Sequence, residues 1–323
     1  MLDVHRLRLL RELDRRGTIA AVAQALAYTP SAVSQQLAAL EREAAVPLLE
    51  RSGRRVVLTA AGVELARRAD DVLALLEQAE AAVAARRDGL TGRLQVGAFP
   101  SAMRTMLPAA LVTLGREHPG LELTVTELDP SAVPDALRSR ALDVGLTQEY
   151  DYLPARPEPA LDHELLLAET IYLAVPVSHA QCSSPAASAS AAPDARADGD
   201  TGQLARYSDA SWIAGTPGTL CYQMTIRACE AAGFTPRVRH HADDFGTVLA
   251  LVAGGQGVAL VPTLGTDAAP EGVELLPLAA RRRSHLACRR GSRQHPAIAA
   301  CAAALRAAAA AHPLTADSVS ALR

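Results

Sequence analysis

Three polar side chains near the N-terminus, Ser31, Ser34 and Gln35, can donate hydrogen bonds to the edges of DNA bases and accept them. They follow Thr29, which can cap a helix, and Pro30, which suits the first helical position because an N–H group has no partner there. A helix that begins at Pro30 carries the three side chains on its first turns. A recognition helix presents side chains to the major groove in this way, and we expect Thr29 and Pro30 to lie at the same interface.

The elements around this helix predict a helix-turn-helix. Val33, Leu37 and Leu40 recur at helical spacing, which turns the polar side chains away from the core. Upstream, Thr18 caps a second helix, whose small Ala23 permits a close crossing of helices. A further helix before it is predicted by apolar residues at helical spacing, at Val4, Leu7, Leu10 and Leu13.

A basic hairpin is expected after the three helices, over residues 51–59, with its turn at Ser52-Gly53. Three arginines of this hairpin, Arg51, Arg54 and Arg55, suit contacts with DNA phosphates. The sequence therefore predicts a winged helix-turn-helix.

The distribution of charge agrees with this prediction. Residues 1–61 carry nine arginines and six acidic residues, a net charge of +3, whereas the whole chain has a net charge of −3, so the remainder carries −6. The basic end is the candidate for DNA binding. For Arg15 and Arg16, a solvated helix face explains the charge equally well.

A long helix without internal proline is predicted from Gly62 to about Gly89. One apolar seam at heptad spacing runs along it, formed by Leu65, Ala69, Val72, Leu76, Ala79 and Val83. A single seam cannot bury itself, so we expect either a partner helix from a second copy or packing against the body of the same chain.

From Gly92 onward, strands alternate with helices, which is typical of an α/β domain. Strands are expected at 94–99, 121–127, 144–147, 171–175, 212–213, 240–241 and 258–261. Helices are expected at 103–118, 133–140, 221–232, 245–253 and 296–311, and the last of them is expected to return to the first unit.

The ligand-binding positions of such a domain follow from topology. Small molecules bind outside the C-terminal ends of the strands, where helix N-termini supply N–H donors that favour an anion. By this rule the candidate residues are Pro100, Ser101, Thr147, Thr216, Gly218 and Thr219. Ser101 and Thr216 have helix capping as an alternative role.

The order of several segments resembles the LysR-type transcriptional regulators over nearly the whole chain. These segments are TIAAVAQAL, TPSAVSQQLAALERE, VPLLER, LTAAG, GLTGRLQVG and LVAGGQGVALVP. Where the family pattern has Leu-Gly before Val-Pro-Leu, this chain has Ala44-Ala45, so a helix-ending glycine is missing; Leu49 stands where the family has Phe.

The resemblance implies the organisation and the partners of the protein. It implies a linker helix that pairs two subunits, and two lobes joined by paired crossovers, as in periplasmic solute-binding proteins, with an effector cleft between them. The implied partners are double-stranded DNA with an interrupted palindromic operator, a small-molecule effector, RNA polymerase and further copies of the chain, as a dimer or tetramer.

The expected domain boundaries combine these observations. A winged helix-turn-helix covers residues 1–61, a dimerisation helix residues 62–89 and an effector-binding domain residues 90–311. Within the last, lobe I is expected at about 90–168 and 269–311, and lobe II at about 169–268. The composition of 180–203 predicts a disordered insertion, and 312–323 a flexible tail.

No metal, cofactor or catalytic site is predicted. Residues 254–257, Gly-Gly-Gln-Gly, precede a strand, whereas a dinucleotide loop precedes a helix, so they indicate a turn. His240, His241, Asp243 and Asp244 are too close in sequence to converge on a metal from a strand. Gly-x-Ser-x-Gly and Cys-x-x-Cys motifs do not occur, which argues against an enzyme.

Two other functions stay open as alternatives. The second part alone has the architecture of a solute-binding or ligand-carrier protein, although the charged N-terminus, without a signal-peptide apolar stretch, predicts a cytoplasmic protein. No apolar run is long enough for a membrane span. A thiol-redox sensor would use Cys221 and Cys229, but eight residues along one helix separate them by ~12 Å, beyond the reach of a disulfide.

Overall fold

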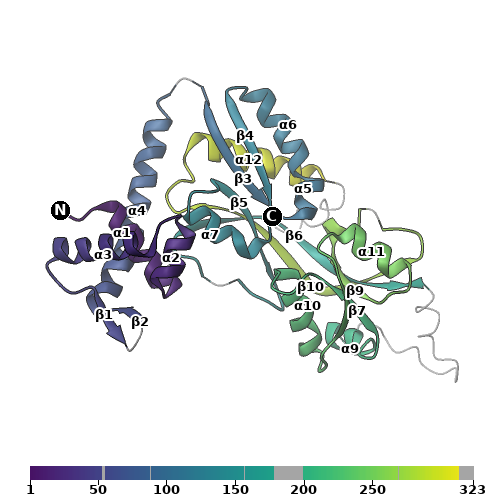
Figure 1. The fold of residues 1–323 in the computed structure, drawn as a ribbon. Coiled ribbons are helices and arrows are strands. Elements are labelled where there is room, and N and C mark those ends of the chain that lie inside the picture. Colours follow the sequence, from purple (N-terminus) through teal and green to yellow (C-terminus); the bar gives the residue numbers. More distant parts are fainter. Residues whose placement is uncertain (53–54, 88, 156, 178–198, 268, 313–323) are drawn as a thin grey trace, which may run out of the picture.

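The computed structural model describes residues 1–52, 55–87, 89–155, 157–177, 199–267 and 269–312. Along the chain lie a small N-terminal domain, the long helix α4 (Ala60–Ala84) and a larger C-terminal domain of strands and helices (Figure 1). The fold class expected from the sequence is confirmed, with a winged helix-turn-helix, a linking helix and a two-lobed α/β domain.

The N-terminal domain has the predicted three helices and hairpin. Its elements are α1 (Val4–Arg16), α2 (Ile19–Ala25), α3 (Pro30–Ala44), β1 (Leu49–Ser52) and β2 (Arg55–Leu58). Helix α3 begins at Pro30, and the hydroxyl oxygen of Thr29 accepts a hydrogen bond of 3.2 Å from the N–H of Ala32. Apolar side chains of the three helices meet in one buried core, among them Leu10, Leu13, Val22, Val33, Leu37 and Leu40.

The end of α3 shows the effect of the missing glycine. Ala45 follows the last helical residue with a φ of 53°, in the left-handed region. Glycine adopts this conformation freely, whereas the Cβ of alanine makes it unfavourable by about 1–2 kcal/mol. The helix therefore ends where the family pattern ends it, at a local cost in stability.

Helix α4 divides its apolar residues between two environments. Of the two environments expected for the seam, Ala69 has the second, packing against the body of the same chain instead of a partner helix, because it is fully buried in the core of the N-terminal domain; Leu65 packs against that core. Val72, Leu76 and Val83 are 36%, 38% and 65% exposed. The helix also ends at Ala84, earlier than expected.

The C-terminal domain is built on a six-stranded sheet in the order β4-β3-β5-β10-β6-β9. Its strands are β3 (Gly92–Ala98), β4 (Leu121–Glu127), β5 (Val144–Tyr150), β6 (Leu161–Pro176), β9 (Ala259–Pro262) and β10 (Val273–Arg289). Strand β3 pairs in parallel with β4 and β5, whereas β10 pairs antiparallel with β5 and β6, and β9 antiparallel with β6. A second sheet pairs β7 (Ser211–Ala214) with β8 (Arg237–His241) in parallel.

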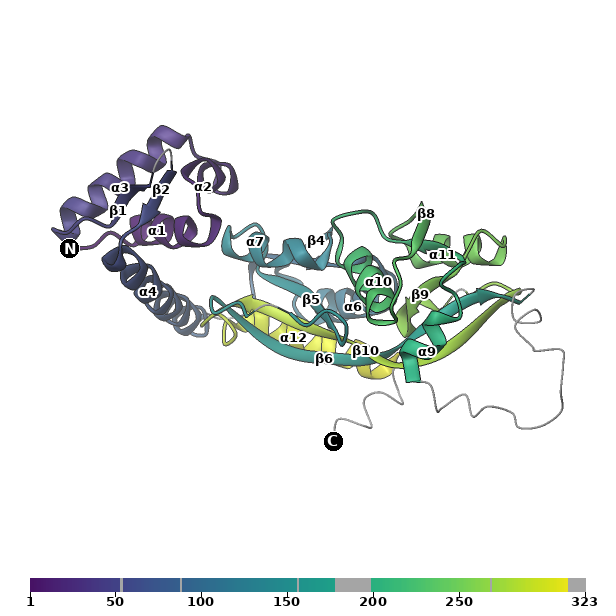
Figure 2. The same ribbon diagram turned by 90° about the horizontal axis from the view of Figure 1, so that it is seen from below.

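Two long strands join the lobes. Strands β6 and β10 contain 16 and 17 residues and run side by side through both lobes (Figure 2). The sequence predicts only a short strand at 171–175 within β6, so the crossovers between the lobes are longer and more regular than expected. Lobe I contains β3, β4 and β5, and lobe II contains β7, β8 and β9.

Helices cover both sheets, and at two places the helical residues differ from those predicted. They are α5 (Pro100–Thr105), α6 (Leu107–Glu117), α7 (Val133–Arg138), α9 (Gly199–Ala205), α10 (Leu220–Ala231), α11 (Phe245–Ala253) and α12 (Pro296–Ala311), with short 3-10 turns at Pro130–Ala132 and Thr263–Gly265. The segment expected to form one helix at 103–118 is divided at Met106 between α5 and α6. Pro108 lacks an N–H group and its ring clashes with the carbonyl one turn earlier, so it fits the first turn of α6 but not the interior of one continuous helix. The last residues of the expected insertion, 199–203, are helical in α9, and the rest of it, 180–198, lies outside the described residues.

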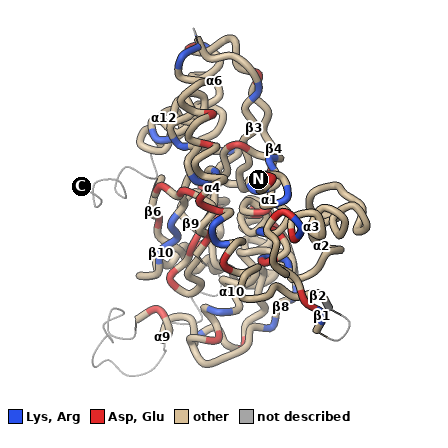
Figure 3. Tube along the Cα trace, turned by 90° about the vertical axis from the view of Figure 1, so that its left-hand side faces the viewer, with Lys and Arg blue, Asp and Glu red and all other residues tan. Residues whose placement is uncertain are grey.

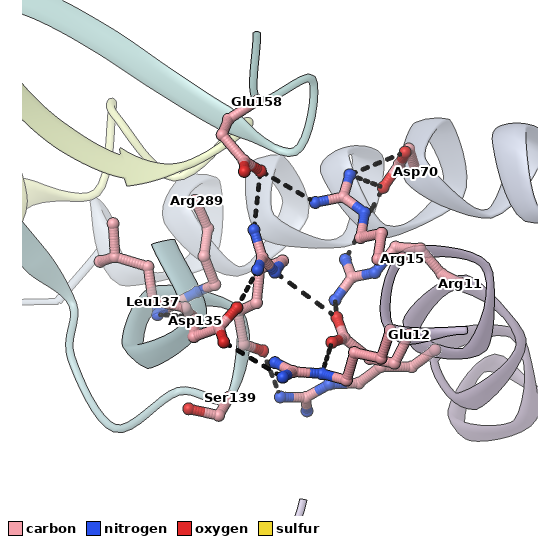
Figure 4. Close-up of polar contacts among 12 residues, drawn as sticks. Arg11, Glu12, Arg15, Asp70, Asp135, Leu137, Ser139, Glu158 and Arg289 are labelled. Atoms are coloured by element: carbon pink, nitrogen blue, oxygen red, sulfur yellow. Dashed lines mark hydrogen bonds and ion pairs between the residues drawn. The ribbon is translucent and has the colours of Figure 1, made fainter. Parts of the chain in front are cut away.

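Ion pairs fasten the N-terminal domain to lobe I. The carboxylate of Glu12 is fully buried and accepts hydrogen bonds from Arg11 (2.8 Å) and Arg16 (2.9 Å), while the Nε of Arg138 from α7 lies 3.8 Å away (Figure 4). Glu158 of lobe I binds Arg138 at 2.7 Å and Arg15 at 3.2 Å. Basic and acidic positions both gather around α1 and α4 (Figure 3).

The charge of Glu12 depends on its arginine partners. Burial by itself would raise the pKa of Glu12, but the charge of Arg11 and hydrogen bonds from Arg16 and Arg11 outweigh burial, so the pKa of Glu12 lies below its usual value. The folded protein therefore holds Glu12 as a carboxylate more firmly than the unfolded chain does. Its contribution to stability is present above the unfolded pKa of about 4.3 and is lost as pH falls through the lower folded pKa.

Replacing Glu12 with Gln should therefore destabilise the protein by about 3 to 5 kcal/mol near neutral pH, because buried guanidinium groups lose their counter-charge. The difference from the parent should begin to narrow below about pH 4.3, where Glu12 of the unfolded chain takes up a proton, and should vanish only as pH falls through the lower pKa of the folded protein. Chemical denaturation at several pH values measures both effects. Glu122→Gln, the same change at an exposed position, is the control, and equal effects of both variants would contradict the assignment.

Candidate functional site

The first candidate surface is the N-terminal end of α3. Thr29, Pro30, Ser31, Ser34 and Gln35 are all exposed there, so the structure brings these five sequence candidates together on one surface. The hydroxyls of Thr29 and Ser31 lie 3.1 Å apart. A helix end with exposed hydroxyl and amide groups can enter a groove of the width that DNA offers.

The hairpin beside α3 carries the basic candidates. Arg51 is exposed on β1, where it pairs with Val56 of β2, and Ser52 pairs with Arg55. The backbone of Arg55 belongs to β2, and Arg54 lies outside the described residues. Arg15 and Arg16 have a different role from DNA contact, since both are engaged in ion pairs with acidic residues.

The second candidate site is a cavity of about 180 Å³ between the lobes, called here the interlobe cavity. Its walls come from the ends of β3, β4 and β5, from the starts of α10 and α11, and from the middle of β10. The lining residues are Phe99, Pro100, Ser101, Glu127, Leu128, Asp129, Pro130, Gln148, Thr219, Cys221, Asp243, Phe245 and Arg282.

Of the six sequence candidates for this site, Pro100, Ser101 and Thr219 line the interlobe cavity. Thr147 does not, because successive side chains of a strand point to opposite faces: its hydroxyl lies 3.5 Å from Nδ1 of His163, and its neighbour Gln148 takes the cavity side.

The other two candidates shape the neighbouring loop. Both the N–H and the hydroxyl of Thr216 donate hydrogen bonds of 2.7 Å to the carboxylate of Asp243. Gly218 is exposed with a φ of 101°, a conformation that glycine supplies without strain, and its carbonyl accepts a bond from Gln223. Thr216 therefore orients Asp243, which does line the cavity.

A buried ion pair forms the floor of the interlobe cavity. The Nη2 of Arg282 lies 2.6 Å from Glu169, and both side chains are almost entirely buried. The same nitrogen donates to the hydroxyl of Ser101 at 3.4 Å, and the guanidinium lies 5.0 Å from the centre of the Phe99 ring. Burial by itself would lower the pKa of Arg282, but the charge of Glu169, its hydrogen bond and the smaller effects of Tyr150 and Cys221 together outweigh burial, so the pKa of Arg282 is raised and it stays charged.

The side-chain amide of Gln148 also lines the cavity, and it can both accept and donate hydrogen bonds. The hydroxyl of Tyr150 donates to its Oε1 at 2.9 Å and lies 3.6 Å from the sulfur of Cys221. Among the described residues, the buried Nε2 of Gln148 has no hydrogen-bond partner. A buried donor without a partner is unfavourable, so this amide is poised to bind a ligand acceptor.

The remaining polar groups of the cavity are acidic. Asp129 accepts hydrogen bonds from Ser131 in lobe I and from the N–H of Leu220 in lobe II, the latter at 3.1 Å. Asp243 and Glu127 add two more carboxylates to the lining. Among the described residues of the lining, Arg282 is the one arginine, and it is already neutralised by Glu169, so these residues do not offer a free positive charge to an anion.

Sequence reasoning missed Gln148, Arg282 and Glu169. Gln148 could have been found from the two-residue period of the strand, once Thr147 was chosen. Arg282 and Glu169 lie 113 residues apart in sequence, and no local pattern marks either of them.

The two cysteines of the redox alternative both lie on α10 and are free. Burial raises the pKa of Cys221, and it raises the pKa of Cys229 to about 12. A thiol is reactive as a thiolate, so both environments oppose oxidation. Over the part of the chain that the structure describes, no cluster of histidine, cysteine or acidic side chains fits a metal ion, and no helix is long and apolar enough to cross a membrane.

Two family models match the chain. One, the LysR substrate binding domain, matches residues 87–310, and the other, the bacterial regulatory helix-turn-helix protein of the lysR family, matches residues 4–63. The first covers more than half of the chain. The protein belongs to the LysR family of transcriptional regulators, with a helix-turn-helix domain and an effector-binding domain.

Relatives and solved structures agree with this assignment. The transcriptional dual regulator GltC of Bacillus subtilis (strain 168) is 26% identical over 81% of each chain, and a probable hydrogen peroxide-inducible genes activator of Mycobacterium avium is 30% identical over 74% of this chain and 71% of that protein. A mutant of Corynebacterium glutamicum OxyR shares the fold with a TM-score of 0.54 at 23% identity, covering 99% of this chain and 95% of that chain. Full-length BenM does so with a TM-score of 0.52 at 21% identity, covering 95% and 96%.

Proposed function

We propose that this regulator reads its operator through Ser31, Ser34 and Gln35, with Thr29 and Pro30 at the same interface, and holds DNA phosphates with Arg51, Arg54 and Arg55. The observation that carries this proposal is the exposed, capped N-terminal end of α3 beside the basic hairpin. The protein acts in the cytoplasm, where it meets DNA and RNA polymerase, and it has no catalytic role.

We also propose that the protein binds an interrupted palindrome as a dimer or tetramer. Beyond Ala69, helix α4 presents Val72, Leu76 and Val83 at heptad spacing, and all three are exposed. Such a stripe is stabilised when a second α4 covers it, which places two recognition helices for two half-sites.

The effector, in our proposal, binds in the interlobe cavity and is small and neutral or positively charged. The helix N-termini at this site predict an anionic ligand, but the lining favours a neutral or cationic one, because it contains Glu127, Asp129 and Asp243 while its Arg282 is already paired with Glu169. The amide N–H of Gln148 in lobe I, which has no partner among the described residues, can donate to a ligand, and the hydroxyl oxygen of Thr219 in lobe II, whose hydrogen is donated to the carbonyl of Thr216, can accept from a ligand. A ligand that contacts both lobes shifts the population between lobe arrangements if it binds one of them more tightly.

The role of α3 is tested by a randomised-site selection with Gln35→Ala and Arg51→Ala. Gln35→Ala should relax base preference at one position of each half-site, by about 1 to 3 kcal/mol, because a base contact is lost. Arg51→Ala should weaken all duplexes alike and reduce the slope of log affinity against log salt by about one. Unchanged preference in Gln35→Ala would remove this residue from the base-reading set.

The role of α4 is tested by Leu76→Asp, which places a charge in the proposed apolar contact. The variant should sediment as a smaller species than the parent and lose tight operator binding, because burying an unpaired charge is strongly unfavourable. Gln78→Asp adds the same charge about 200° away around the helix and should leave assembly intact. A Leu76→Asp protein of parental size would mean that the stripe is covered in another way.

The interlobe cavity is tested with a panel of neutral, cationic and anionic amino acids, amines and carboxylates in thermal-shift and calorimetric titrations. Binding should come from the neutral or cationic members, and Gln148→Leu should weaken it about tenfold, since a hydrogen bond in a buried site is lost. Thr147→Val, on the opposite face of β5, is the matched control. Binding by carboxylates alone would overturn the proposed charge.

A further inference from the structure

A second cavity, of about 340 Å³, lies where α1, α4 and lobe I meet, and is called here the junction cavity. Six arginines from three parts of the chain line it: Arg8, Arg11, Arg138, Arg140, Arg289 and Arg290. Against them stand three lining carboxylates, Asp70, Glu77 and Glu80, all from α4. The lining therefore carries an excess of positive charge, in contrast to the interlobe cavity.

Most of these arginines already have carboxylate partners. Glu77 binds Arg140 at 2.7 Å and Arg289 at 2.9 Å, and Arg290 binds Asp71 at 3.1 Å. These pairs fix the positions of the guanidinium groups around the cavity but do not use all of their N–H donors, since each guanidinium has five.

Arg8 is the exception. Among the residues that the structure describes, no carboxylate oxygen lies within 4 Å of its guanidinium, which donates one hydrogen bond of 2.6 Å to the carbonyl of Arg138. Burial, followed by the charges of Arg11 and Arg140, lowers the pKa of Arg8 from its ordinary value. Its positive charge is thus only partly hydrated and lies among other positive charges, a situation that a bound anion relieves.

Two further N–H groups belong to lining residues, and the one of Arg138 lies 3.8 Å from the carboxylate of Glu12, beyond hydrogen-bond distance. The Nε atoms of Arg11 and Arg138 are buried and form no hydrogen bond within the described part of the chain, although both side chains make ion pairs through their terminal nitrogens. Both residues are more than nine-tenths buried.

We propose that the junction cavity binds a small oxyanion, a phosphate or carboxylate group, with Arg8 as its main partner. Arg8 belongs to the N-terminal domain, and Arg138, Arg140 and Arg289 belong to the C-terminal domain. An anion between them accepts charge-assisted hydrogen bonds from both domains. The ligand therefore holds the DNA-binding domain against lobe I, at a site separate from the effector cavity.

The size of the cavity is compatible with more than an inorganic ion. A volume of about 340 Å³ lies within the range of small-molecule sites, and Val4, Leu73 and Leu76 give one side of it an apolar lining. The common chemistry is the oxyanion group, and its source is either free phosphate or an organic phosphate or polycarboxylate.

The test uses the full-length protein and inorganic phosphate as the probe, with sodium chloride at matched ionic strength as the salt control. Phosphate should raise the unfolding midpoint of the parent and bind in calorimetry, while Arg8→Gln should bind about tenfold to a hundredfold more weakly. Arg8→Lys should bind with intermediate affinity because it keeps the charge, and Arg93→Gln, at an exposed site remote from the cavity, should bind like the parent. Citrate and a sugar phosphate in the same assay then identify the preferred source.

Hydrogen exchange of α1 and a second variant, Arg140→Gln, test the proposal independently of the binding affinity of Arg8→Gln. Hydrogen exchange of α1 should slow when phosphate binds the parent, because the ligand joins α1 to lobe I, and should not respond in Arg8→Gln. Arg140→Gln provides a second variant should Arg8→Gln fold poorly, and it too should weaken binding. Equal phosphate binding by parent, Arg8→Gln and Arg140→Gln, or an equal effect of sodium chloride, would overturn the proposal.

Discussion

The buried ion pair between Arg282 and Glu169 is the constraint on which the sensing domain depends. It joins β10 to β6, the two strands that run through both lobes, at the level of the interlobe cavity. Removing one partner of such a pair leaves a charge without compensation in the interior, which costs about 3 to 5 kcal/mol. Arg282 also contacts Ser101 and Phe99, so the pair holds the first helix of lobe I against the strands that lead into lobe II.

The lobes meet across the cavity through a few polar contacts. Asp129 of lobe I accepts a hydrogen bond from the N–H of Leu220 in lobe II, and Arg104 of α5 binds Asp244 at 2.7 Å. These groups are partly or fully exposed, where ion pairs contribute little to stability. The long strands β6 and β10 therefore fix how the two lobes are connected. Because the polar contacts across the cavity are weak, they do not hold the distance between the lobes against a bound ligand.

The N-terminal domain is anchored to lobe I and to the linking helix. Arg138 and Glu158 reach it from lobe I, and Asp70 reaches it from α4. In the proposed mechanism, a change in the angle between the lobes acts on the DNA-binding domain through lobe I, where the Glu12 cluster and the junction cavity lie. The charged side chains of the Glu12 cluster and of the junction cavity therefore lie between the effector-binding domain and the DNA-binding domain.

Sequence alone determined the elements that depend on local chemistry. Thr29 and Pro30 start α3 because a cap and a proline act within one turn, and the positions of α11 and α12 follow from their apolar period. It also determined the family, because the ordered motifs extend along nearly the whole chain. The break between α5 and α6 was not predicted, although Pro108, which causes it, is a local signal in the sequence.

Tertiary structure decided which side chains meet. Ala69 and Leu76 occupy the same predicted seam, yet only the N-terminal domain, folded back on α4, determines that Ala69 is buried while Leu76 is free. Arg282 and Glu169, and likewise Glu12 and Arg138, come together across more than a hundred residues of chain. No periodicity of one segment encodes such pairs, because their energy depends on burial and on opposite charges that only the folded chain brings within a few ångströms.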